Sequence, residues 1–282
     1  MMAWSRPVVL AIAGILVVLA ATGITLAVHG GVGSRGTVGG VVPTTSTASK
    51  ARGGICEQLT VAAYFSPAYW KKAIDSKHPP ADMILNPASG PGNAPNPTLQ
   101  SLVKQAQARG ITVLGYSSTV DGQRPAADVE TDVRKYAAWY GVTSSFLDLV
   151  KGDAQQFSYY KQLADYIHGA YPGAQVWLNP GVYPDENYMS IGDVVMVFEG
   201  TYAQYTTAQV PSWALSYPPA RFQDTIYAAL GNVLASALQT AQLRDVGHVY
   251  VTDLVGSNPY QALPSYWATE NAAAVAGCSG SG

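Results

Sequence analysis

Short apolar runs that end on a polar side chain recur along most of the chain, and helical patterns lie between them. Residues 144–149 illustrate the pattern: the run lies between Gly141 and Lys151 and carries a carboxylate, Asp148, at its exit. A run this short between turn-forming residues predicts a buried strand whose last residues leave the core. Comparable runs lead into six other polar side chains, which are Tyr64, Asn86, Tyr116, Asn179, Glu199 and Asp253.

This alternation of strands and helices predicts a single (β/α)8 TIM barrel over residues 55–282. We expect strands at residues 59–65, 82–86, 111–116, 144–149, 175–178, 193–198, 221–227 and 248–252. Strands that alternate with helices run parallel, and eight such units close into a barrel of roughly 250 residues. The unit after residues 179–181 has room for only a short helix. The strand ends of a barrel meet at one face, so the polar residues that follow them should gather there.

The first 54 residues have a different composition. Residues 7–28 are apolar and carry no ionisable side chain, a stretch longer than the roughly 7–15 residues of a signal-peptide core. It is also long enough to span about 30 Å of hydrocarbon. We therefore expect residues 1–28 to direct export, either as a cleaved signal peptide or as a retained membrane anchor. Residues 29–54 are mostly Gly, Thr, Ser and Val, which predicts a disordered linker.

Charge and aromatic content narrow the classes of partner. Charged residues make up 12% of the chain, against about 25% in ordinary soluble domains, and the net charge of −2 comes without a basic run. Nucleic acid is therefore not an expected partner. The chain has 18 Tyr and 5 Phe, and tyrosines at a barrel mouth suit either packing or the binding of sugar rings. The four histidines show no metal-ligand spacing, so we expect no metal site. We also expect no cofactor and a monomer.

The two cysteines, Cys56 and Cys278, lie at opposite ends of the predicted barrel. The first and last elements of a closed barrel are neighbours, so a disulfide between these positions is sterically reasonable. Two unrelated free thiols are the alternative. Export to an oxidising, extracellular space would fit the disulfide.

Several separated motifs resemble the spherulation-specific family 4 (spherulin-4-like) proteins in their order and spacing. The motifs are Asn86-Pro87 with Ser89-Gly90-Pro91-Gly92, Gly115-Tyr116 with Thr119 and Gly122-x-Arg124, Phe146-Leu147-Asp148, Asn179-Pro180-Gly181, and Phe198-Glu199. The match extends over nearly everything from Val61 to Asp253. The resemblance implies a TIM-barrel glycoside hydrolase that cuts within an α-1,4-linked, galactosamine-containing polysaccharide.

The resemblance also implies an Asp-Glu pair at the fourth strand end and a Glu after Phe at the sixth. Asp148 and Glu199 match the first and third of these acids, whereas Leu149 stands where the second is usual. Glycoside hydrolysis needs one protonated and one ionised carboxyl. We expect Asp148 to be the nucleophile and Glu199 the acid/base, with its pKa raised by partial burial. The expected substrate-binding residues are Tyr64, Asn86, Tyr116, Arg124, Asn179, Tyr202 and Asp253.

Two alternatives to a hydrolase remain open at this point. A sugar-binding pseudoenzyme would hold the same polymer without turnover, and Leu149 is the feature that favours it. A structural surface protein would neither bind nor cut, and the aromatic side chains near Glu199 would then pack inward.

Overall fold

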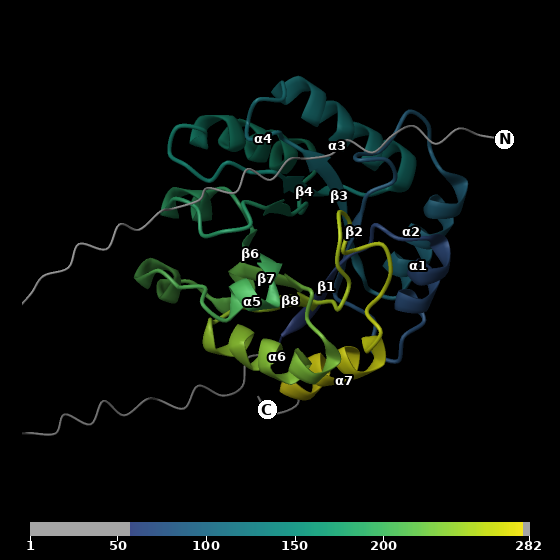
Figure 1. The fold of residues 1–282 in the computed structure, drawn as a ribbon. Helices are drawn as coiled ribbons and strands as arrows, with labels where there is room; N and C mark the ends of the chain where they lie inside the picture. Colours follow the sequence, from purple (N-terminus) through teal and green to yellow (C-terminus); the bar gives the residue numbers. More distant parts are fainter. Residues whose placement is uncertain (1–56, 279–282) are drawn as a thin grey trace, which may run out of the picture. The chain divides into compact units, whose positions relative to one another are not determined.

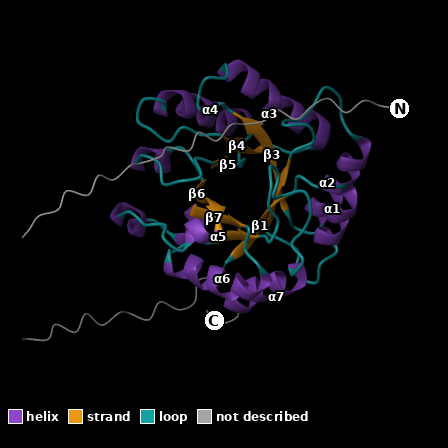
Figure 2. Ribbon diagram, in the orientation of Figure 1, coloured by secondary structure: helices purple, strands orange, loops and turns teal. Residues whose placement is uncertain are grey.

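The computed structural model describes residues 57–278, with side chains described as far as residue 274. Its strands form one closed parallel barrel in chain order, and Figure 2 shows these strands surrounded by helices. The predicted TIM barrel is thus confirmed, and the predicted strands agree with the observed ones to within a few residues at each end. The strands are β1 (Gln58–Ala62), β2 (Asp82–Leu85), β3 (Thr112–Ser118), β4 (Ser144–Asp148), β5 (Val176–Leu178), β6 (Val194–Thr201), β7 (Phe222–Tyr227) and β8 (His248–Val251).

The helices lie outside the barrel and follow the strands in the expected alternation (Figure 1). After β5 there is only a short 3-10 helix, in agreement with the abbreviated unit predicted there. The α-helices are α1 (Pro67–Ile74), α2 (Pro97–Ala108), α3 (Ala126–Tyr140), α4 (Phe157–Ala170), α5 (Tyr202–Tyr205), α6 (Leu234–Leu243) and α7 (Trp267–Cys278). The 3-10 helices are η1 (Glu186–Ser190), η2 (Ser212–Ser216), η3 (Pro219–Arg221) and η4 (Gly231–Val233).

Local sequence signals fix where α2 and α3 begin and end. The Asn96 side chain accepts hydrogen bonds from the amides of Thr98 and Leu99, at 3.0 and 3.2 Å, so it caps the N-terminus of α2. Pro97 occupies the first helical position, where its missing N–H costs nothing. Gly141 ends α3 in the left-handed region, with a φ of 65°, which glycine adopts without strain. The capped start of α2 bounds the β2–α2 loop at the barrel mouth, whereas Gly141 leads into β4 at the opposite end of the barrel.

Close packing of α3 against the barrel holds β3 in place. A Cβ atom on Gly115 would lie 2.6 Å from the ring of Tyr136, so only glycine permits this approach of helix and strand. The Tyr136 hydroxyl donates a 3.1 Å hydrogen bond to the carbonyl of Leu85 on the neighbouring strand. This contact ties α3 to β2 as well as to β3, next to the position from which Tyr116 enters the mouth.

The barrel closes between β1 and β8 through a short ladder. The paired positions are Gln58 with His248 and Leu59 with Val249, both near the amino ends of the strands. Beyond this ladder, a carboxylate oxygen of Glu270 on α7 accepts the amide hydrogen of Val251 at 2.7 Å. The seam between the first and last strands is therefore completed by a buried side chain rather than by strand pairing.

The predicted export segment and linker, residues 1–28 and 29–54, lie outside the described residues. So do Cys56 and the side chain of Cys278, which leaves the expected disulfide as a prediction. Within residues 57–278 no helix is both long and apolar enough to cross a membrane.

Candidate active site

One amide nitrogen brings the two predicted carboxylates together at the barrel mouth. Nδ2 of Asn179, which directly follows β5, donates to Oδ1 of Asp148 and to Oε2 of Glu199, each at 2.7 Å. These two oxygens are therefore no more than about 5.4 Å apart, twice that length. Asp148 ends β4 and Glu199 lies on β6, so three successive strands supply the cluster.

Two tyrosine hydroxyls hold the remaining carboxylate oxygens. Tyr116 on β3 donates to Oδ2 of Asp148 at 2.7 Å. Tyr260 donates to Oε1 of Glu199 at 2.6 Å. All four oxygens of the pair thus accept a hydrogen bond from a neutral side chain, which fixes both carboxyl groups before any ligand arrives.

Tyr260 was not among the residues predicted from the sequence. It belongs to the connection between β8 and α7, which reaches over the strand ends in Figure 1, and it is only 6% exposed. Its amide donates to the side chain of Asn258 at 3.0 Å, a local turn that holds the loop. The sequence signal for such a turn was present in Asn258-Pro259, but no strand end marks this position.

The ring of Tyr64 packs against both tyrosines that donate hydrogen bonds to the carboxylates. It meets the rings of Tyr116 and Tyr260 edge to face, with centroids 5.6 and 5.8 Å away. Such T-shaped contacts stabilise the rings in place and keep them apart from one another. The three tyrosines come from the ends of β1 and β3 and from the β8–α7 connection, and two of them reach the carboxylates.

Burial dominates the electrostatics of the site. Burial first, and then the neighbouring Glu199, raise the pKa of Asp148 from 3.8 to about 6. Burial also raises the pKa values of the Tyr116 and Tyr260 hydroxyls, and the nearby carboxylates raise them further. Both tyrosines therefore stay neutral and act as donors. Burial thus raises the pKa of Asp148, the residue that the sequence predicts to be the nucleophile.

The backbone after Asp148 makes a fixed bend at Leu149. Leu149 has a positive φ of 52°, which costs a leucine of order 1 kcal/mol and needs support from its surroundings. The hydroxyl of Thr119 contacts the carbonyl oxygens of Asp148 and Leu149, at 2.9 and 2.7 Å, and the amide of Asp121 donates to Leu149. The position that departs from the family pattern is therefore held rigidly beside the pair.

Two of the predicted substrate-binding side chains, those of Arg124 and Asp253, bond to other residues of the protein. Arg124 makes an ion pair of 2.7 Å with Asp132 and donates to the carbonyl of Ser118. Asp253 accepts hydrogen bonds from the amide and the hydroxyl of Ser265. Both side chains thus anchor loops near the mouth, and neither makes a hydrogen bond to Asp148, Asn179 or Glu199.

Asn86 and Tyr64 lie beside a separate small pocket, whereas Tyr202 begins the short helix α5. Asn86 accepts the amide hydrogen of Gly90 at 2.9 Å, which holds the glycine-rich loop after β2. Tyr202 is partly buried and makes no hydrogen bond to the carboxylate pair. Among the described residues, no group of three His, Cys, Asp or Glu side chains has the geometry to hold a metal ion.

Comparison with known proteins agrees with this architecture. The model of spherulation-specific family 4 matches residues 58–274. Spherulin-4 of Physarum polycephalum is 28% identical over 231 residues, which cover 77% of this chain and 69% of that protein.

Two solved structures share the fold. Aspergillus clavatus Sph3, crystallised with GalNAc, superposes with a TM-score of 0.67 at 23% identity, over 79% of this chain and 98% of that one. A GH2 beta-galacturonidase from Eisenbergiella tayi, bound to galacturonate, gives a TM-score of 0.50 at 10% identity, over 79% and 51% of the two chains. Since the family model covers most of the chain, the protein belongs to spherulation-specific family 4.

Proposed function

We propose that this protein is a glycoside hydrolase that cuts within a galactosamine-containing polysaccharide, with Asp148 and Glu199 as its catalytic pair. The observation that carries the proposal is the Asn179 nitrogen, which places two carboxylate oxygens within about 5.4 Å of each other. A separation of roughly 5–5.5 Å between carboxyl groups is typical of glycosidases that retain anomeric configuration. Family membership, and the GalNAc with which the Sph3 of similar fold was crystallised, favour an amino sugar as substrate.

The chemistry divides between the two carboxyls. One gives its proton to the leaving glycosidic oxygen, and the other attacks the anomeric carbon to form a glycosyl ester. Water then releases the ester, with the first residue now acting as base. Because burial raises the pKa of Asp148 to about 6, the pair retains one proton in mildly acidic solution, as this division requires.

The tyrosines and Asn179 support this chemistry without taking part in bond making. Their donated hydrogen bonds fix the positions of both carboxyl groups. The ring of Tyr64 offers a flat surface on which a sugar could stack at the mouth.

The test is turnover of acetylated and deacetylated galactosaminoglycan, followed by the release of reducing ends. We expect Asp148→Asn to lose on the order of a thousandfold or more in kcat while the barrel stays folded. Asp165→Asn is the matched control, since Asp165 lies exposed on α4 in an ion pair with Lys161. No turnover by the wild type on either polymer, or undiminished turnover by Asp148→Asn, would overturn the proposal.

A sugar-binding protein without turnover is the second candidate. Leu149 favours it, because a leucine in this rigid bend cannot supply the additional acid that the family pattern has there. Binding of the polymer by the wild type, with no reducing ends released, would decide for this candidate.

We also propose that residues 1–28 direct export, so that the barrel meets its polymer outside the cell or on the outer face of the membrane. Fractionation of cells that express the full chain, with and without residues 1–28, tests this. The barrel should remain inside the cell when the segment is deleted.

A further inference from the structure

A closed ring of hydrogen bonds surrounds Leu149, the residue that follows Asp148. The amide of Lys151 donates to the hydroxyl oxygen of Tyr160 at 2.9 Å. The hydroxyls of Tyr160 and Thr119 lie 3.0 Å apart. The Thr119 hydroxyl also lies 2.7 Å from the carbonyl oxygen of Leu149 and 2.9 Å from that of Asp148. The bonds therefore begin on the chain just beyond Leu149 and return to it through two side chains, one from α4 and one from the end of β3.

Each hydroxyl in this hydrogen-bond ring has a fixed direction. A carbonyl oxygen can only accept, so the Thr119 hydrogen points to the carbonyl of Leu149 or Asp148. The oxygen of Tyr160 accepts the amide hydrogen of Lys151. The hydrogen of Tyr160 then goes to Thr119 at 3.0 Å rather than to the Leu149 carbonyl at 3.4 Å. Both side chains are fully buried, so water does not compete for these bonds, and bonds in one direction strengthen one another.

The hydrogen-bond ring supports a backbone conformation that leucine adopts only under constraint. Leu149 has a φ of 52°, which is unfavourable for a residue with a Cβ atom and persists only where the surroundings hold it. On the far side of the bend, the buried Tyr188 donates to the carbonyl of Lys151 at 2.9 Å. Gly152 packs so closely on Pro184 that a Cβ atom there would lie 2.5 Å from it. The chain beyond β4 is therefore held on both sides of the bend.

The position of this bend is linked to the direction of the Asp148 side chain. The carbonyl of Asp148 accepts from the amide of Thr119 at 2.9 Å and lies at the same distance from its hydroxyl. The carboxyl oxygens of Asp148 accept from Tyr116 and Asn179, each at 2.7 Å. If the backbone at Leu149 relaxed, it would carry the carboxyl group away from both donors. A displacement of about 1 Å at a reacting group can cost a hundredfold in rate.

We propose that Thr119 and Tyr160 are positioning residues for Asp148, whose backbone their hydroxyls hold so that its carboxyl group meets the sugar in one orientation. This inference rests on the proposed function and adds two residues to its machinery. The bonds of both hydroxyls go to the backbone or to each other, and both side chains are fully buried. They therefore act through Asp148 and not on the substrate, so their loss should lower kcat and leave KM nearly unchanged.

The first test compares two substitutions of Thr119. Thr119→Val keeps the branched shape and removes the hydroxyl, whereas Thr119→Ser keeps the hydroxyl. We expect Thr119→Val to lower kcat on galactosaminoglycan by a factor of roughly 10–100, with KM changed less than about twofold. Thr119→Ser should retain about half of the wild-type kcat or more. An unchanged kcat in Thr119→Val, or equal losses in the two variants, would overturn the inference.

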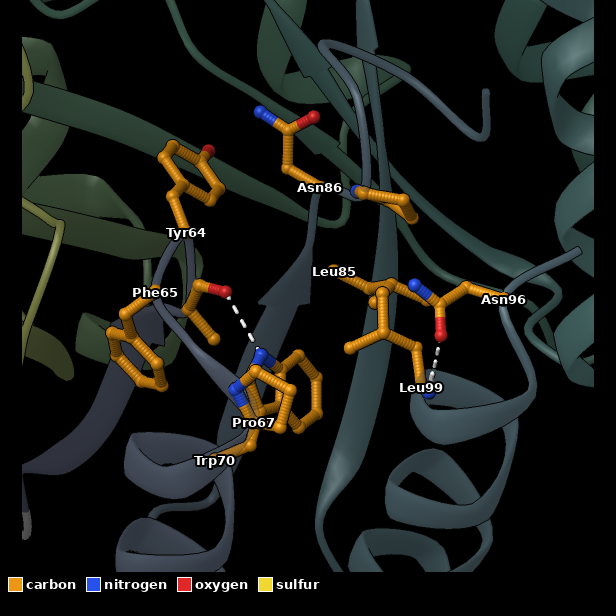
Figure 3. Close-up of a pocket in the computed structure, with 10 residues that line it drawn as sticks. Tyr64, Phe65, Pro67, Trp70, Leu85, Asn86, Asn96 and Leu99 are labelled. Carbon is orange, nitrogen blue, oxygen red and sulfur yellow. Dashed lines mark hydrogen bonds between the residues drawn. The ribbon is translucent and has the colours of Figure 1, made fainter. Parts of the chain in front are cut away.

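The second test compares two buried tyrosines, Tyr160 on α4 and Tyr140 on α3. The hydroxyl of Tyr140 also accepts a backbone amide hydrogen, that of Asn96 at 3.1 Å. Figure 3 shows Asn96 at the start of α2, so this contact is not part of the hydrogen-bond ring. Tyr160→Phe and Tyr140→Phe should both lose some stability, but only Tyr160→Phe should lower kcat, by a factor similar to that in Thr119→Val. Equal kcat values in the two tyrosine variants would overturn the inference.

Titration of the Asp148 carboxyl separates this inference from the proposed hydrolysis, because it needs no turnover. Carbon-13 NMR of the side-chain carboxyls follows the ionisation of Asp148 in the free protein, and Asp148→Asn identifies its resonance. Burial is the largest cause of the raised pKa of about 6. A carboxyl group that leaves its position becomes more exposed, so its pKa should fall toward the ordinary 3.8. The titratable groups that face it, Tyr64, Tyr116 and Glu199, stay in place in every variant.

We expect this fall in Thr119→Val and in Tyr160→Phe but not in Tyr140→Phe. A pKa of Asp148 that is unchanged or higher in the first two variants would overturn the inference, whether or not the wild type cuts the polymer. A wild type without turnover refutes the hydrolysis alone. Thermal unfolding identifies the folded variants, and either Thr119→Val or Tyr160→Phe suffices for the comparison.

Discussion

Tyr260 donates a hydrogen bond of 2.6 Å to Glu199, although the two residues are 61 positions apart in the chain. The other oxygen of Glu199 accepts from Asn179, so the carboxyl group is held at both ends. Tyr260, in the loop between β8 and α7, thereby orients the side chain of Glu199 on β6. The arrangement makes Tyr260 a positioning residue for the proposed reaction.

Removing the Tyr260 hydroxyl should slow catalysis without unfolding the protein. We expect Tyr260→Phe to lower kcat about tenfold with a small change in KM, since the hydrogen bond acts on Glu199 and not on the substrate. Tyr266→Phe is the control: this hydroxyl donates to the carbonyl of Ala229 instead. Equal effects of the two variants would contradict the assigned role.

The spacing of the carboxyls predicts the stereochemical result. With nearest oxygens no more than about 5.4 Å apart, there is little room for a water between them, and direct attack by one carboxyl is favoured. We expect the first product to keep the α configuration of the substrate. Proton NMR of the fresh hydrolysis product, recorded before mutarotation, measures this. An initial β product would refute the double-displacement route.

The half-buried Asp148 should make stability depend on pH. Its pKa in the folded protein is about 6, above the ordinary 3.8, so the folded state favours the protonated form. Stability is therefore highest below about pH 4 and falls as pH rises through 6, by up to roughly 3 kcal/mol from this group. Asp148→Asn removes this dependence and should be more stable than the wild type at pH 7.

Chemical denaturation at pH 4 and pH 7 measures this difference between the wild type and the variant. Asp165→Asn again serves as control, because its carboxylate lies on the exposed face of α4. A wild type that gains stability relative to Asp148→Asn between pH 4 and pH 7 would contradict the raised pKa of Asp148.

The same pKa bears on which carboxyl gives the proton. A raised pKa favours Asp148 as the proton donor and leaves Glu199 to attack, the reverse of the roles expected from the sequence. If so, Asp148→Ala should retain activity on an aryl glycoside, whose leaving group needs no proton, while Glu199→Ala is inactive and recovers with azide. The opposite pattern would restore Asp148 as nucleophile.

Strand positions were predictable because each barrel strand is a short apolar run between turn residues. The rule that parallel strand ends share one face then brings Asp148, Asn179 and Glu199 together, and the structure places them within hydrogen-bond distance. The alternation of strands and helices alone does not determine which hydrogen bonds these side chains make. Asn179 Nδ2 can reach both carboxylates only with a particular register of β4, β5 and β6. The sequence pattern does not determine that register.

Loop residues account for most of what the sequence could not predict. Arg124 and Asp253 have the chemistry of substrate ligands, yet Asp132 and Ser265 lie close enough to occupy them. Tyr260 lies nine residues beyond β8, where no periodic pattern fixes the path of the chain. Which of several polar loop residues reaches the mouth depends on tertiary contacts between segments distant in the sequence.

The contribution of Tyr260 also ties catalysis to the order of synthesis. A ribosome synthesises Tyr260 after both acids, so a nascent chain that already contains Asp148 and Glu199 still lacks the hydroxyl that aligns Glu199. Full turnover should appear only after the barrel has closed and the loop that carries Tyr260 has folded over the strand ends. Enzymatic activity would then require the fully folded barrel. Chains truncated before Tyr260 would be inactive whatever their helical content.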